Sequence, residues 1–154
     1  MKARTFVLSL STCFVVLTFC MAQDTMMGTW KLNEAKSKIG AGSPKNNTVV
    51  IEAAGEDVRV TMEGVDAAGK ATHSEWTGKF DGKDYPVTGD SSSDTRAYKK
   101  IDDRTVEVTV KKAGQVTISG RVVVSPDGKT RTAHVSGTSP SGGKFQTTAV
   151  YDKQ

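Results

Sequence analysis

The sequence predicts an all-β protein, an antiparallel up-and-down β-barrel of nine or ten strands with at most one short helix after the first strand. Runs of alternating apolar and polar residues begin at residue 28 and continue almost to the last residue. Short turns that contain glycine separate these runs, and no amphipathic stretch of about ten residues offers a crossover helix. Neighbouring strands should therefore be antiparallel. Closure into a barrel removes the edge strands, whereas the alternative, a two-sheet sandwich, needs longer connections.

The first predicted strand is "GTWKL", residues 28–32, which holds one of the two tryptophans of the chain. The only helix candidate follows at residues 33–39, with Asn33 as its N-cap, and the Gly- and Pro-containing stretch after it limits it to one or two turns. Alternation is clearest in the strand at residues 104–112, where every second residue from 106 to 110 is valine. The other strands are predicted at residues 48–55, 57–64, 71–80, 85–87, 94–101, 115–124, 129–137 and 144–152.

Residues 1–22 are predicted to be a cleaved signal peptide. Lys2 and Arg4 precede an uncharged apolar stretch at residues 5–19, and small residues occupy the positions that determine cleavage before and at Ala22. The apolar stretch is short for a membrane span, which needs ~20 residues. We therefore expect cleavage after Ala22 and a secreted or periplasmic location.

Two alternatives stay open for this leader, an uncleaved anchor and a lipoprotein acylated at Cys20. The lipoprotein is the weaker of these because the bulky Phe19 stands where such sites have a small residue. Cleavage would leave a single domain at residues 23–154 without cysteine, since Cys13 and Cys20 both lie in the leader. A mature protein without disulfides or thiols has no cysteine-based catalysis and no cysteine–zinc site.

The charge of the predicted mature chain is nearly balanced. The whole chain has 21 basic and 17 acidic residues, and loss of Lys2 and Arg4 leaves 19 basic residues and a net charge of +2. The charges alternate in sign and form no basic block, so we expect no nucleic-acid partner. We also expect no membrane-spanning segment after cleavage, and a monomer.

The sequence has few residues arranged as enzyme active sites require, and we expect no catalytic residues, cofactor or metal. The only histidines, His73 and His134, lie on predicted strands without the spacing of a metal site. The serines cluster in loops and form no nucleophile motif. The stretch at residues 81–96 holds four aspartates but lacks the pattern of a calcium loop, so we interpret it as a solvated loop at the barrel rim.

A family resemblance rests on the two ends of the chain. The motif "GTWKL" resembles the Gly-x-Trp signature at the first strand of lipocalins and of the related intracellular fatty-acid-binding proteins, together called calycins. The terminal "VYDKQ", residues 150–154, is similar to the last strand of fatty-acid-binding proteins. The resemblance implies a barrel that binds a small apolar molecule, with Gly28 and Trp30 as structural residues at its closed end. The whole looks like the bacterial, cysteine-free lipocalin-like proteins.

The sequence also departs from these relatives. Residues 33–47 are too few for the two-helix lid of the fatty-acid-binding proteins, and the disulfide usual in secreted lipocalins is absent. In fatty-acid-binding proteins an arginine two residues before the tyrosine of the last strand binds a carboxylate. Here that position is Ala149, so this anchor is not carried over.

Aromatic residues are the candidate ligand contacts. Trp76 and Phe80 share a face of one predicted strand, and Phe145 and Tyr151 share a face of the last strand, each with small residues between them. Inside a barrel such faces leave space beside rings that contact an apolar ligand. Tyr98 on the strand at 94–101 completes the aromatic set. The alternative is that all these residues simply fill the core.

Arg131 is the candidate charged contact. It alternates with Ala133 and Val135 on the strand before the last, one hairpin from Tyr151, and facing inward it would replace the missing anchor for an acidic ligand. The opposite register would place His134 and its threonine neighbours inside and Arg131 in water. Periodicity does not choose, because both faces are half apolar and a slip of one residue exchanges them.

We therefore expect a secreted or periplasmic barrel that reversibly binds a small hydrophobic or amphipathic molecule. The alternative is a cell-envelope or extracellular interaction protein that acts through the outer surface of a filled barrel. A calycin-like enzyme is a third hypothesis, disfavoured by the lack of acid–base residues.

Overall fold

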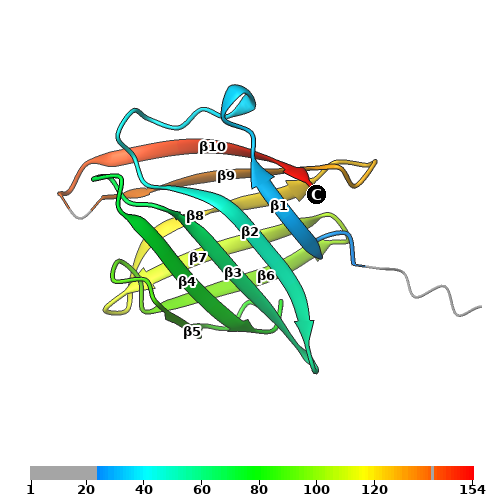
Figure 1. Cartoon of the computed structure of the whole chain (residues 1–154). Helices are drawn as coiled ribbons and strands as arrows, with labels where there is room; N and C mark the ends of the chain where they lie inside the picture. Colours follow the sequence, from blue (N-terminus) through cyan, green and yellow to red (C-terminus); the bar gives the residue numbers. More distant parts are fainter. Residues whose placement is uncertain (1–23, 140) are drawn as a thin grey trace, which may run out of the picture.

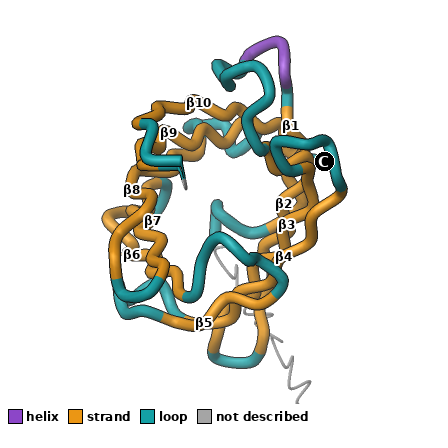
Figure 2. The backbone as a smooth tube through the Cα atoms, turned by 90° about the vertical axis from the view of Figure 1, so that its left-hand side faces the viewer, coloured by secondary structure: helices purple, strands orange, loops and turns teal. Residues whose placement is uncertain are grey.

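The structure, a computed structural model, describes residues 24–139 and 141–154; the predicted signal peptide lies outside them. The predicted fold class is confirmed: ten antiparallel strands close into one barrel (Figures 1 and 2). Each strand pairs with its neighbours in sequence, and the last pairs with the first. The strands are β1 (Gly28–Leu32), β2 (Lys45–Ala54), β3 (Asp57–Val65), β4 (Ala71–Gly78), β5 (Tyr85–Thr88), β6 (Thr95–Asp102), β7 (Thr105–Lys112), β8 (Gln115–Val124), β9 (Thr130–Thr138) and β10 (Lys144–Lys153).

The helix expected after the first strand is a single 3-10 turn, η1 (Glu34–Lys36). Its N-cap is Asn33, whose side chain accepts a hydrogen bond from the backbone N–H of Lys36 at 3.2 Å. The chain leaves β1 for this turn and returns to pair with β10 at Lys38 and Thr148. No helix among the described residues is long and apolar enough to cross a membrane.

The two ends of the barrel differ, and we name them by the last strand. The closed end is the end at which β10 finishes, and Trp30 lies there, opposite Lys153. Trp30 is completely buried, its indole N–H donates to the carbonyl of Met26 at 3.0 Å, and the Lys153 ammonium lies 5.0 Å from its ring centre. Residues 24–27 thus pack against the closed end of the barrel. The open end is the end at which β10 begins.

Strand β5 is the weakest part of the wall. It pairs with β4 only through Thr88 and Val87 and with β6 only through Tyr85 and Pro86. Proline offers no N–H to a ladder, which explains why the strand is short. The irregular stretch expected at residues 81–96 is therefore two loops with a short strand between them.

Candidate ligand-binding site

Three neighbouring strands, β8, β9 and β10, place their inward residues in four cross-strand rows. Residues directly opposite each other on paired antiparallel strands point to the same face. Members of these rows pack in the core, so the rows face the barrel interior. From the closed end to the open end they are Val124–Arg131–Tyr151, Val122–Ala133–Ala149, Gly120–Val135–Thr147 and Ile118–Gly137–Phe145.

Burial decreases along these rows toward the open end. The row of Arg131 is closed to solvent, with Arg131 and Tyr151 each 4% exposed. In the two rows nearest the open end, all six residues are partly exposed although they face inward. In the row between them Ala133 is partly exposed and Ala149 is buried. The exposure of the inward residues on this wall therefore decreases from the open end toward Arg131.

Arg131 is a buried cation that pairs with no acidic side chain in residues 24–139 and 141–154. Its guanidinium carbon lies 5.3 Å from the ring centre of Tyr151, a cation–π contact. Its Nε has no hydrogen-bond partner, and no carboxylate of the described residues lies within ion-pair distance of the guanidinium. Burial lowers the pKa of Arg131, while the neighbouring Tyr151 and Tyr98 oppose that change; an arginine nevertheless stays charged at neutral pH.

Tyr151 responds to the same environment. Burial raises the pKa of its hydroxyl, and the positive charge of Arg131 opposes the rise. Tyr98 contributes to the pKa of both residues, so the two tyrosines and Arg131 lie together in the interior. Of the two registers that the sequence left open for β9, the structure has the one with Arg131 inside.

The other aromatic candidates form a separate cluster. Trp76 is completely buried, and its ring centre lies 4.8 Å from Tyr98, 5.7 Å from Tyr85 and 6.2 Å from Phe80. Its indole N–H donates to the carbonyl of Arg96 at 2.9 Å. These rings are packed against one another. Phe145 lies away from them, in the row at the open end.

Glycine is required in that last row. A Cβ on Gly137 would lie 2.3 Å from the backbone carbonyl oxygen of Thr117, 2.9 Å from Cζ of Phe145 and 3.1 Å from Cγ1 of Ile118, so the β8 backbone and the phenyl ring both occupy the space that a larger residue would need. Gly137 and Phe145 thus pack together at the open end of the β8–β10 wall.

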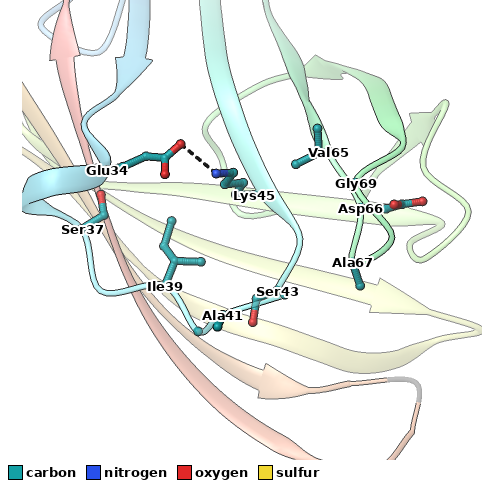
Figure 3. Close-up of a pocket in the computed structure, with 12 residues that line it drawn as sticks. Glu34, Ser37, Ile39, Ala41, Ser43, Lys45, Val65, Asp66, Ala67 and Gly69 are labelled. Atoms are coloured by element: carbon teal, nitrogen blue, oxygen red, sulfur yellow. Dashed lines mark hydrogen bonds and ion pairs between the residues drawn. The ribbon is translucent and has the colours of Figure 1, made fainter.

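Two surface hollows lie near the open end. One, of about 420 Å³, separates the β1–β2 connection from the β3–β4 turn, and Figure 3 shows Glu34 and Lys45 facing each other beside it with 2.7 Å between Oε1 and Nζ. Ile39 of the β1–β2 connection also lines it. The other, of about 620 Å³, lies over the ends of β8–β10 and is lined by Phe145 and Gly137 together with outward residues such as Ser136. This hollow therefore extends over both faces of β8–β10 at the open end.

The histidines and aspartates have ordinary partners. His73 contacts Glu63 at 2.5 Å and His134 contacts Thr148 at 3.1 Å, both on the exposed surface. In the part of the chain that the structure describes, no three His, Cys, Asp or Glu side chains gather as a metal site would require. The aspartates at 84, 90 and 94 each pair with a basic side chain.

Sequence reasoning missed a second buried arginine, Arg96 on β6. Its Nη2 lies 2.8 Å from Oδ2 of Asp90 in the β5–β6 loop, and its Nη1 donates to the sulfur of Met62 at 3.0 Å. Alternation with Tyr98 on a predicted strand was the available signal, because an inward Tyr98 requires an inward Arg96.

Comparison with known proteins identifies no family for this chain. No protein-family model matches the sequence, and no curated protein matches it. Among solved structures, the chain is similar to a redesigned β-barrel, mFAP1, whose structure was determined bound to DFHBI. The two share 12% sequence identity over 84% of this chain and 95% of that chain, with a TM-score of 0.45.

Proposed function

We propose that this protein is a secreted or periplasmic barrel that reversibly binds a small amphipathic molecule, with the acidic group of the ligand on Arg131 and its apolar part along β8–β10. The observation that carries the proposal is the buried guanidinium of Arg131 at the end of a solvent-accessible, small-residue wall. A buried charge without a partner destabilises a fold by several kcal/mol, on the order of what a ligand anion would recover.

The chemistry of the wall suits a ligand with one acidic end and an apolar body. Ala133 and Val135 are inward, apolar and partly exposed, and Phe145 offers a ring at the entrance. A carboxylate, sulfonate or phosphate would satisfy Nε and one Nη of Arg131 together, since the guanidinium presents paired N–H donors. Binding rather than catalysis is proposed, because the inward residues of the four rows described above include no His, Asp, Glu, Lys or Cys.

The first test compares dodecanoic acid with dodecanol in titration calorimetry. A charge-assisted hydrogen bond contributes about 1.5–3 kcal/mol, so the acid should bind the wild-type protein roughly 10- to 100-fold more tightly than the alcohol. In Arg131→Met this preference should disappear while the affinity for dodecanol stays. The control is Arg121→Met, which removes an exposed arginine paired with Glu107 on the outer face of β8.

The same variant separates a binding role from a structural one. If Arg131 serves binding, Arg131→Met should stabilise the ligand-free protein by about 1–4 kcal/mol in urea unfolding, as when other buried ionic groups are replaced by apolar ones. Equal loss of acid and alcohol binding, or a less stable variant with an unchanged acid preference, would reject the proposal.

The location is tested on the full chain. Expressed in a bacterial host with a secretion pathway, the protein should be recovered outside the cytoplasm with Gln23 as its first residue, because cleavage is expected after Ala22. An N-terminus at Met1, or a lipid-modified N-terminus at Cys20, would replace this proposal by one of its two alternatives. Mass spectrometry of the purified protein distinguishes all three.

A further inference from the structure

One row of inward residues at the open end crosses five strands and is open on only one side. From β6 to β10 the row is Arg96, Val110, Ile118, Gly137 and Phe145, each directly opposite the next. The last three residues are partly exposed, as described above. Arg96 and Val110 are buried, although they lie in the same row. Another segment of the chain therefore covers the β6–β7 half of the opening.

The cover over Arg96 is the β5–β6 loop, residues 89–94. Asp90 accepts hydrogen bonds from Nη2 of Arg96 at 2.8 Å and from the hydroxyls of Ser92 and Ser93 at 2.6 Å each. Ser93 is 2% exposed, so the loop is folded inward around the carboxylate. The loop follows β5, the strand with the fewest ladder pairs, so this cover is attached to the least stable part of the wall.

The guanidinium of Arg96 is incompletely satisfied in this arrangement. The side chain is 10% exposed, yet its Nε has no hydrogen-bond partner among the described residues. Its Nη1 donates to a thioether sulfur, which is a weak acceptor. Asp90 is thus the single strong acceptor on a buried fork of five N–H donors.

We propose that Arg96 is a second anion-binding site of the barrel, and that Asp90 is a built-in occupant which an acidic ligand group displaces. Displacement releases the loop at residues 89–93, while Asp94 stays paired with Lys112, and opens the β6–β7 half of the entrance. The ligand class is again a carboxylate, sulfonate or phosphate on an apolar body. The inference deepens the proposed function and rests on it for the identity of the ligand, but not for the site.

The test removes the first anion site and uncovers the second. In the Arg131→Met background the preference for dodecanoic acid over dodecanol should be lost, because an acid that displaces Asp90 from Arg96 exchanges one carboxylate for another without a net gain. Adding Asp90→Asn keeps the size of the side chain and removes its charge, so the preference should return by ~10-fold or more, the effect of one charge-assisted hydrogen bond. Adding Arg96→Met to this pair should abolish the preference again. Glu107→Gln, which removes an exposed ion-pair partner on the outer face, is the matched control in place of Asp90→Asn.

A second measurement does not depend on any ligand. Asp90→Asn should increase amide hydrogen exchange at Ser92 and Ser93 by ~10-fold or more, because this part of the loop loses its charged attachment to Arg96. Exchange in β8–β10 should stay unchanged. This result reports on the cover even if the variant binds no amphiphile.

The outcomes separate the two proposals. If Arg131→Met leaves the acid preference of the wild type intact, the proposed function fails, whatever the loop does. If Arg131→Met removes the preference but Asp90→Asn does not restore it, or restores it equally with Arg96→Met present, the second site is overturned. Unchanged hydrogen exchange in Asp90→Asn would overturn the displaceable cover.

Discussion

Individual residues affect the stability of this barrel in opposite ways, and Trp30 stabilises it. It is completely buried at the closed end, it is hydrogen-bonded to Met26, and Lys153 covers its ring. Arg131 and Arg96 are the opposite case, because each is a buried charge that the surrounding side chains satisfy incompletely. Residues of the second kind lower stability and are expected where a ligand completes the site.

The contribution of Trp30 to the free energy of unfolding is measurable. Trp30→Ala removes a buried aromatic side chain and leaves a cavity, so the free energy of unfolding should fall by about 3–5 kcal/mol. Trp30→Phe retains most of the ring and should lose less, about 0.5–1.5 kcal/mol for the hydrogen bond to Met26 plus a smaller packing term. Urea unfolding followed by circular dichroism compares the variants. An unchanged midpoint for Trp30→Ala would show that the closed end does not depend on the indole.

At the scale of the elements, strand existence was predictable and strand facing was not. Period-2 alternation at residues 104–112 predicted β7 to within a residue, because apolar and polar positions there do not mix. Strand β9 has half-apolar faces on both sides, so periodicity left its register open. The register follows from its neighbours: Val124 on β8 and Tyr151 on β10 face inward, and Arg131 lies between them.

The contact between Asp90 and Arg96 shows a second limit of sequence reasoning at this scale. The two residues are six positions apart, one in a loop and one in a strand, and no period links them. The aspartate-rich stretch was visible, but the turn that aims Asp90 at β6 depends on Gly89, whose φ is +78°, and on hydrogen bonds from Ser92 and Ser93. Such a site is assembled by tertiary structure.

At the scale of the whole molecule, closure makes the wall cooperative. β1 is held on one side by β2 and on the other by the last residues of the chain, so the N-terminal strand cannot pair fully until the C-terminus has arrived. This closure was predictable from the number of strands and the need to remove edges. The burial of inward residues at the open end could not be predicted from the sequence, because it depends on which half of the entrance the β5–β6 loop covers.

Several aspartates around the barrel have a pKa that differs from its ordinary value, and Asp90 is a partly buried example. Burial alone would raise the pKa of Asp90, but hydrogen bonds from Ser92 and Ser93 and the charge of Arg96 outweigh it, and the pKa falls below its ordinary value. Other aspartates also have a lowered pKa because they accept hydrogen bonds from nearby backbone or side-chain donors: Asp81, Asp94, Asp102, Asp127 and Asp152.

These shifts predict that acid destabilises the barrel. A carboxylate whose pKa is lower in the folded than in the unfolded state stabilises the fold above its unfolded pKa of about 4, and that contribution is lost as pH falls through the folded value. The free energy of unfolding should therefore be flat from about pH 7 to pH 5 and decrease below about pH 4. Asp90→Asn should make the decrease shallower and also lower the plateau, since the partner of Arg96 is lost at every pH. Urea titrations at a series of pH values test this, and a stability that rises toward pH 3 would contradict the direction of these pKa shifts.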